Sequence, residues 1–468
     1  MNDYQKRHKK IVRERIIAVI LTLLILGGLI TAAVIALPKL VEPILPDPGE
    51  EEGGEPEDVL SGNEPAGAEE ETGEIEEEEP EIDSEALKEQ VEDALSEAEE
   101  EDIEPEIKGA INVMTNEQKI AQLFFVTPEA VTKVDPTTAV GERTKETYRA
   151  LPVGGLIYFA KNFEDPVQTK EMLTDMQRLA LSVNSLPVFL GVDEEGGSVV
   201  RIADNPTFQV EKVPGMATVG NGGDTGAAAS AGRTIGKYLS EYGFNLDFAP
   251  VADVLTSDSG FMKERSFGSD PGTVGDMAVS FAGGLAENGI IPCYKHYPGI
   301  GDADKNTDLS AVSINRSIEE LRTGELVPFR QAVSANACFI MAGHAEYPDI
   351  DPGVPASMSS KLIKGVLRDE LGYEGIVITD ALNAKAVTGR YSPGEAAVAA
   401  FNAGCDMLLM PENLEEAYEA MLHAYENGDI SNDRLMESLV RILSVKLESG
   451  KLPVSAEEAA AVSENALP

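Results

Sequence analysis

The chain of 468 residues carries 82 acidic side chains against 37 Lys and Arg, a formal net charge of −45. A chain this acidic repels the phosphates of nucleic acid, so we expect no nucleic-acid partner. The length alone would allow two or three domains, but shifts in composition indicate one large domain that follows an anchor and a linker.

The N-terminal residues predict a membrane anchor. A basic tail, residues 1–15, precedes residues 16–38, which are apolar and contain no charged side chain. About 20 apolar residues span a bilayer as a helix. The basic flank predicts that this end stays in the cytoplasm and that the remainder is exported. We therefore expect a single-pass protein of the cell membrane with an extracytoplasmic main domain. A cleaved signal peptide is the alternative, but its apolar region would be shorter.

An acidic linker is expected to follow the anchor. Residues 39–108 are rich in Asp and Glu and hold few basic or aromatic residues. Such a segment cannot bury enough apolar surface to offset its ordering entropy, so we expect it to be largely disordered and extended. The main domain is then predicted to cover residues 109–455, and residues 456–468 form a C-terminal tail.

The main domain alternates short apolar runs with amphipathic helices. Eight runs in this order are typical of an α/β fold, a (β/α)8 barrel with insertions, or else of an open doubly wound sheet. We favour the barrel. The predicted strands lie at residues 120–126, 155–159, 188–192, 246–251, 290–294, 338–342, 375–378 and 405–410.

Ionisable residues follow most of these runs, at the strand ends where barrel enzymes place their chemistry. A purely structural barrel has no need of them at nearly every strand end, so they indicate an active site. A Lys-His pair with three carboxylates on the next loop suits a ligand with many hydroxyl groups, since each hydroxyl can form a charge-assisted hydrogen bond. The ionisable residues at the ends of the apolar runs are Lys161, Asp193, Glu194, Glu195, Asp253, Lys295, His296, His344 and Asp380.

Cofactor motifs are absent from the sequence. There is no glycine loop of the Walker or Rossmann type, so we expect no nucleotide cofactor. With four His, three Cys and neither CxxC nor HExxH, we also expect no metal site.

Five motifs in this order resemble the bacterial β-N-acetylhexosaminidases of glycoside hydrolase family 3. They lie at residues 192–197 with Arg201, 245–251 with Asp253, 265–268, 295–299 and 377–380. The resemblance implies a barrel enzyme that removes terminal β-linked N-acetylhexosamine from glycans or cell-wall fragments with retention of configuration. Asp380 matches the family's nucleophile. The residues that match its sugar-binding set are Asp193, Arg201, Arg265, Lys295 and His296, although Asp193 and Arg201 could instead form a structural ion pair.

The acid/base position departs from the family pattern. These hexosaminidases carry an Asp-x-His dyad on the loop after the fifth strand, and the matching positions here are Asn306 and Asp308. Asp308 could itself be the acid/base, which is the interpretation we favour, because a carboxylic acid is the usual glycosidase proton donor. Asp302 or Asp304 could serve instead. The third possibility is a surface glycan-binding protein with little or no turnover. In each case the partner is a carbohydrate, and we favour a monomer.

Overall fold

The computed structural model describes residues 105–256 and 262–448. The predicted basic tail, the anchor, the linker up to residue 104 and the C-terminal tail 456–468 lie outside these residues. Within the described ranges, no helix combines the length and the apolar character needed to cross a membrane. Helix α4 (Pro105–Val113) begins inside the range assigned to the linker, and its Ile107 and Ile111 are buried.

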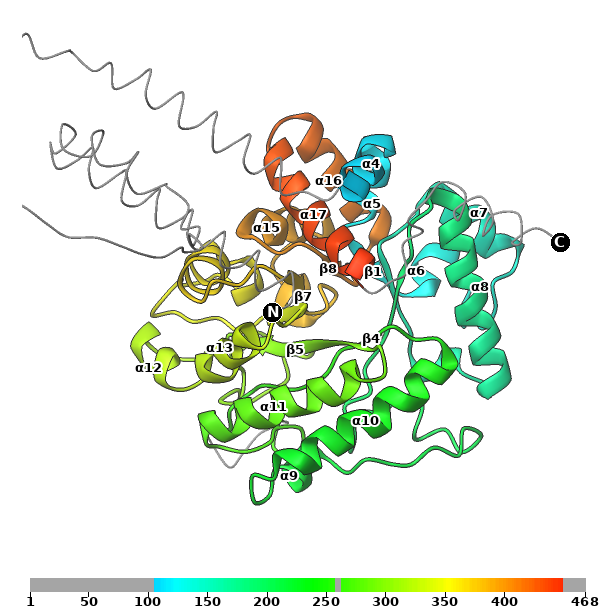
Figure 1. The fold of residues 1–468 in the computed structure, drawn as a ribbon. Coiled ribbons are helices and arrows are strands. Elements are labelled where there is room, and N and C mark those ends of the chain that lie inside the picture. The colour runs from blue at the N-terminus through cyan, green and yellow to red at the C-terminus, as the bar shows by residue number, and fades with distance from the viewer. Residues whose placement is uncertain (1–104, 257–261, 449–468) are drawn as a thin grey trace, which may run out of the picture. The chain divides into compact units, whose positions relative to one another are not determined.

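Eight parallel strands form one sheet that nearly closes into a barrel (Figure 1). Consecutive strands from β1 to β7 are neighbours, β1 also pairs with β8, and a bridge joins Ile378 of β7 to Met407, the residue before β8. This order confirms the barrel and excludes the doubly wound sheet. The strands are β1 (Phe124–Val126), β2 (Gly155–Ile157), β3 (Phe189–Val192), β4 (Leu246–Asp247), β5 (Ile291–Tyr297), β6 (Phe339–Ala342), β7 (Ile376–Thr379) and β8 (Leu408–Leu409).

The observed bounds differ from the predicted range for every strand, and two of these differences are informative. The run 120–126 contributes only its last three residues to β1, because Thr115 caps helix α5 (Asn116–Ala121) and draws Ile120 into it. Strand β5 continues to Tyr297, so Lys295 and His296 lie within the strand rather than after it.

Helices follow the strands and surround the barrel. Side-chain caps begin several of them, including Asp165, Asp224 and Asp270. The helical segments after α5 are α6 (Pro128–Thr132), α7 (Glu142–Ala150), η1 (Ala160–Asn162), α8 (Pro166–Asn184), α9 (Met216–Val219), α10 (Thr225–Tyr242), α11 (Pro271–Ala286), α12 (Ile318–Thr323), α13 (Leu326–Ser334), η2 (Ala356–Met358), η3 (Lys361–Glu370), α14 (Lys385–Thr388), α15 (Pro393–Ala403), α16 (Leu414–Glu426) and α17 (Asn432–Glu448).

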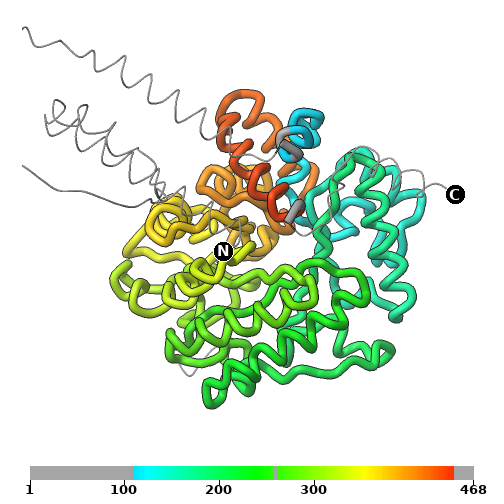
Figure 2. The backbone as a smooth tube through the Cα atoms, in the orientation of Figure 1, coloured from blue at the N-terminus to red at the C-terminus, as the bar shows by residue number. Residues whose placement is uncertain are grey.

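The first and last helices of the domain lie together. Figure 2 shows α4 and α5 beside α16 and α17, so the two ends of the described chain meet where β1 pairs with β8. Helices α10 and α11 pack closely through glycines. A Cβ atom at Gly284 would lie 2.3 Å from the Ala229 carbonyl oxygen, and one at Gly232 would lie 2.1 Å from that of Phe281.

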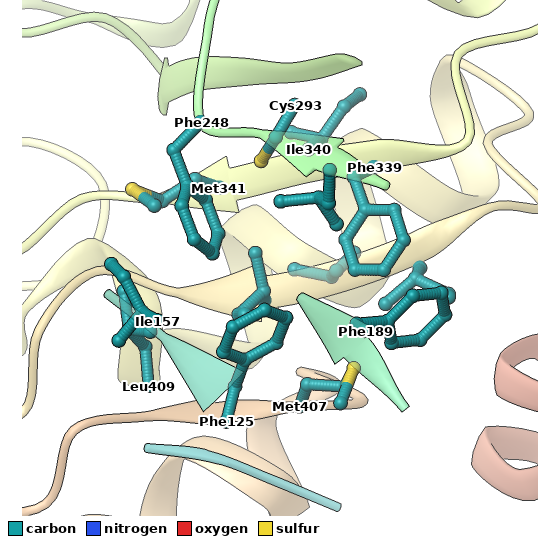
Figure 3. Close-up of a cluster of buried hydrophobic side chains, with 14 of the residues drawn as sticks. Phe125, Ile157, Phe189, Phe248, Cys293, Phe339, Ile340, Met341, Met407 and Leu409 are labelled. Carbon is teal, nitrogen blue, oxygen red and sulfur yellow. The ribbon is translucent and has the colours of Figure 1, made fainter. Parts of the chain in front are cut away.

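Side chains from the strands fill the barrel interior (Figure 3). Phe125 contacts Phe248 edge to face at 5.1 Å between ring centroids, and Phe189 contacts Phe339 in the same way at 5.2 Å. All four rings are buried. Because this interior is packed, the barrel has room for chemistry only at the ends of its strands.

Candidate active site

A buried network of opposite charges lies at the C-terminal ends of β3 and β5. The Lys295 Nζ atom lies 2.7 Å from Asp193 Oδ1 and 2.7 Å from Glu195 Oε1. Arg265 donates two parallel hydrogen bonds to Glu195, from Nε at 2.8 Å and from Nη2 at 2.7 Å. These contacts bring together three of the predicted sugar-binding residues, Asp193, Arg265 and Lys295.

The network keeps its members ionised despite their burial. Burial alone would raise the pKa of Glu195, but the charges of Lys295 and Arg265 outweigh it and lower the pKa to about 2. Burial works in the opposite direction on Lys295, whose pKa nevertheless rises above its usual value because Asp193 and Glu195 stabilise its charge. The site therefore presents fixed charges at neutral pH.

Arg201 completes this side of the site. Its Nη2 atom lies 3.7 Å from Asp193 Oδ2, and its guanidinium lies over the Phe159 ring at 5.7 Å from the centroid. The ion pair considered from sequence therefore exists. Both side chains remain partly exposed, so part of each can still meet a ligand.

His296 is oriented by Asp253, which follows β4. Its Nδ1 lies 2.7 Å from Asp253 Oδ2, while Asp253 Oδ1 accepts a hydrogen bond of 2.7 Å from the Ile300 amide. A carboxylate beside Nδ1 places a proton on that atom, so Nε2 is the ring atom left for a ligand.

Asp380 follows β7, and its backbone is fixed by a 2.8 Å hydrogen bond from its amide to the Ala342 carbonyl. Its Oδ1 accepts a 2.8 Å hydrogen bond from the Ala381 amide. Burial opposes ionisation, but the electrostatic effect of the neighbouring His296 and His344 rings and the hydrogen bond from the Ala381 amide outweigh it and lower the pKa of Asp380. The side chain is half-buried, as an ionised nucleophile at the rim of a barrel requires.

His344 lies buried beside Asp380. Its Nε2 lies 3.0 Å from the Ala381 carbonyl oxygen, and its Nδ1 lies 2.8 Å from the Ser357 hydroxyl. A carbonyl can only accept, so Nε2 carries a proton. Burial lowers the pKa of His344, although the charges of Asp380 and Asp308 oppose this. The ring therefore lies beside the nucleophile with its Nε2 proton directed at the Ala381 carbonyl.

The loop after β5 carries Asp308 to the same rim. Asn306 donates a 3.1 Å hydrogen bond to Asp308 Oδ2 and accepts one of 2.9 Å from the Asp308 amide. The Asp308 and Thr307 carbonyls accept hydrogen bonds from the Lys385 and Ala386 amides of α14, five and six residues after Asp380. Asp308 is exposed, and its charge acts on His344 together with that of Asp380.

The other candidates differ in their surroundings. Asp302 lies 3.5 Å from Arg316, whereas Asp304 is exposed. Lys161 pairs with Asp135 at 2.8 Å, in the loop between α6 and α7.

Sequence reasoning placed Glu195, Asp253 and His344 at the strand ends that indicate an active site, but it gave them no individual role. Their position after a strand was the available signal, but their partners are distant in sequence: Glu195 and Arg265 are 70 residues apart. In the described part of the chain, no group of three acidic, His or Cys side chains could hold a metal ion.

A barrel with an ionised carboxylate among cations and acids at one rim has the architecture of a glycosidase. Residues 115–445 match the family model described as the glycosyl hydrolase family 3 N terminal domain. The chain belongs to glycosyl hydrolase family 3, and it is a glycosidase acting on O-glycosyl bonds.

Individual relatives agree with the family. An uncharacterized secreted glycosyl hydrolase of Arthroderma benhamiae is 30% identical, over 70% of this chain and 97% of the relative. A beta-hexosaminidase of Nitrosomonas eutropha is 32% identical, over 58% of this chain and 76% of the relative. The structure of a family 3 beta-N-acetylglucosaminidase from Paenibacillus has a TM-score of 0.68 at 30% identity, over 76% of this chain and 68% of that chain.

Proposed function

We propose that the protein is a retaining hydrolase that removes terminal β-linked N-acetylhexosamine, with Asp380 as the nucleophile and Asp308 as the acid/base. The observation that carries this proposal is the half-buried Asp380, whose pKa is lowered by His296 and His344 despite burial. The relatives named beta-hexosaminidases support the choice of sugar.

The reaction follows from these roles. Asp193, Arg201, Arg265, Lys295 and His296 hold the sugar. Asp380 attacks the anomeric carbon as the bond to the leaving oxygen breaks, and Asp308 donates its proton to that oxygen. Asp308 then removes a proton from water, which attacks the same carbon and releases the Asp380 carboxylate. Two inversions retain the configuration.

Turnover of two substrates by three variants tests the assignment. Asp380→Asn should abolish cleavage of both 4-nitrophenyl N-acetyl-β-D-glucosaminide and N,N′-diacetylchitobiose. Asp308→Ala should lower kcat on the disaccharide by about 10²- to 10⁴-fold, the usual contribution of a general acid. The nitrophenyl substrate should be largely spared, because nitrophenolate leaves without a proton.

Asp304→Ala is the matched control, since Asp304 is an exposed carboxylate on the same loop. Equal activity of the Asp308→Ala protein on both substrates would remove Asp308 from the mechanism. A disaccharide-specific loss in the Asp304→Ala protein would assign the proton donor to Asp304. Sugar binding without turnover of either substrate would support the glycan-binding alternative.

The location and assembly of the enzyme are part of the same proposal. We propose that residues 16–38 hold a monomeric enzyme at the outer face of the cell membrane, where wall fragments or other glycans would be its substrates. The charge and apolar pattern of the N-terminal sequence supports this. Fractionation of cells is the test: activity in the membrane fraction that is lost when protease acts on intact cells is expected.

A further inference from the structure

The carboxylate of Glu194 is buried at the end of β3, behind the predicted sugar-binding residues. Its Oε2 accepts hydrogen bonds from the amides of Arg201, at 2.5 Å, and Ile202, at 3.0 Å. Its Oε1 accepts from the Ala203 amide at 2.9 Å and from the Tyr238 hydroxyl at 2.9 Å. One side chain thus binds three consecutive amides of the turn that carries Arg201.

The backbone of Glu194 connects this turn to the rest of the site. Its amide donates a 2.9 Å hydrogen bond to Asp247 Oδ1 on β4. Its chain neighbours are Asp193 and Glu195, which both contact Lys295. The position of Arg201 relative to Asp193 therefore depends on a single residue fixed at both its main chain and its side chain.

A carboxylate suits this role better than a neutral side chain. Four donors point at two oxygens, and each carboxylate oxygen can accept two hydrogen bonds. In a glutamine, an NH2 group replaces one of the two oxygens. This donor would face either the Ala203 amide or the two amides of Arg201 and Ile202. A buried amide that has lost its acceptor is costly, so the turn would adopt a different conformation. The guanidinium of Arg201 must lie both near Asp193 and over Phe159, so a shift of this turn displaces it.

We infer that Glu194 is a positioning residue, which holds the turn 201–203 so that Arg201 meets Asp193 and the hydroxyl groups of the sugar. This inference rests on the proposed sugar site. Glu194 itself does not touch the substrate, and its effect on binding passes through Arg201.

A double-mutant cycle tests the inference. Glu194→Gln is made in the wild-type and in the Arg201→Ala background, and kcat and KM are measured with 4-nitrophenyl N-acetyl-β-D-glucosaminide. In the wild-type background we expect KM to rise about tenfold with a smaller change in kcat, within the range of coupling between contacting residues. In the Arg201→Ala background the same substitution should have almost no effect.

Calorimetric binding of N-acetylglucosamine provides a readout that needs no turnover. Its Kd should follow the same pattern, so the inference remains testable if the proposed reaction fails. Asp204→Asn is the matched control. Asp204 directly follows the turn 201–203, but its carboxylate pairs with exposed Lys212 at 2.9 Å. Its KM and Kd should be unchanged.

Tyr238→Phe serves if the Glu194→Gln protein does not fold. It removes one of the four hydrogen bonds, so we expect a smaller rise in KM and Kd that is again absent in the Arg201→Ala background. An equal change in both backgrounds, or unchanged KM and Kd in a folded Glu194→Gln protein, would overturn the inference.

Discussion

Glu195 stabilises two buried cations that face the sugar site. It accepts two hydrogen bonds from Arg265 and contacts Lys295, and all three side chains are largely withdrawn from solvent. An unpaired buried charge is costly, whereas a paired one with good geometry is tolerated. The cations can therefore point toward a ligand without destabilising the fold.

The lowered pKa of Glu195 makes the stability of the fold depend on pH. Its pKa is about 2 when folded and near 4.5 when unfolded, so the unfolded chain binds more protons between these values and stability falls as the pH falls through this window. At about 1.4 kcal/mol per pH unit, the contribution at neutral pH is about 3 kcal/mol.

Denaturation in urea at several pH values measures this effect. Glu195→Gln should unfold more easily than the wild type at pH 7, by about 3 kcal/mol. The difference should narrow as the pH approaches 2. A difference that stays constant from neutral to acidic pH would show that the charge of Glu195 is not responsible.

The packing of α10 against α11 depends on glycine at the contact. Alanine favours a helix over glycine by about 1 kcal/mol, but at Gly284 its Cβ would lie 2.3 Å from the Ala229 carbonyl oxygen. We expect Gly284→Ala to destabilise the protein by about 1–3 kcal/mol because the helices must separate.

Gly283 is the matched control for this substitution. It precedes Gly284 on the same helix, is exposed, and would have no atom within 4 Å of an added Cβ. Gly283→Ala should stabilise the protein by about 0.5–1 kcal/mol. Calorimetric unfolding of both variants measures the two effects: Tm should fall for Gly284→Ala and rise for Gly283→Ala. A rise in Tm for both variants would contradict the close packing of α10 against α11.

Asp406 joins several elements at the opposite, N-terminal end of the strands. It precedes β8 and lies 2.5 Å from Arg368 of η3, 3.4 Å from Arg434 and 3.1 Å from Arg441 of α17. It also accepts a hydrogen bond of 2.9 Å from the Val377 amide of β7. The three guanidiniums outweigh burial and hold the pKa of Asp406 well below its usual value.

Loss of this carboxylate should be severe. We expect Asp406→Asn to lower the free energy of unfolding by about 3–5 kcal/mol, since it leaves buried guanidiniums without their anion. Glu437→Gln should cost under about 1 kcal/mol, because Glu437 contacts Arg434 and Arg441 from an exposed position. Chemical denaturation compares them, and similar losses would contradict a special role for Asp406.

The charge of the whole molecule affects which molecule, water or phosphate, accepts the sugar from Asp380. In the proposed reaction two carboxylates flank the anomeric carbon, in a chain whose net charge is −45. Phosphate would approach this carbon against repulsion, whereas water would not. We expect free N-acetylglucosamine as the product and no sugar 1-phosphate when phosphate is added. Phosphorus NMR of the reaction would detect the phosphorylated sugar, whose formation would contradict the proposed acid/base.

The barrel could be predicted from sequence because its signals are local. Each strand lies in a short apolar run, and parallel strands bring the residues that follow them to one rim. The pairing of Glu195 with Arg265 could not be predicted, because it depends on how two long loops fold over that rim. The helix at 116–121 was missed because its last two residues, Ile120 and Ala121, were assigned to the apolar run 120–126, while its capping box lies before that run.

The arginine cluster around Asp406 lies at the opposite end of the strands from Asp380. The groups that secure the closure of the barrel are therefore separate from those that would contact the sugar. Substitutions that change ligand preference can therefore be introduced at the rim with Asp380 without disturbing the ion pairs of Asp406. This separation makes the scaffold suitable for redesign toward other sugars.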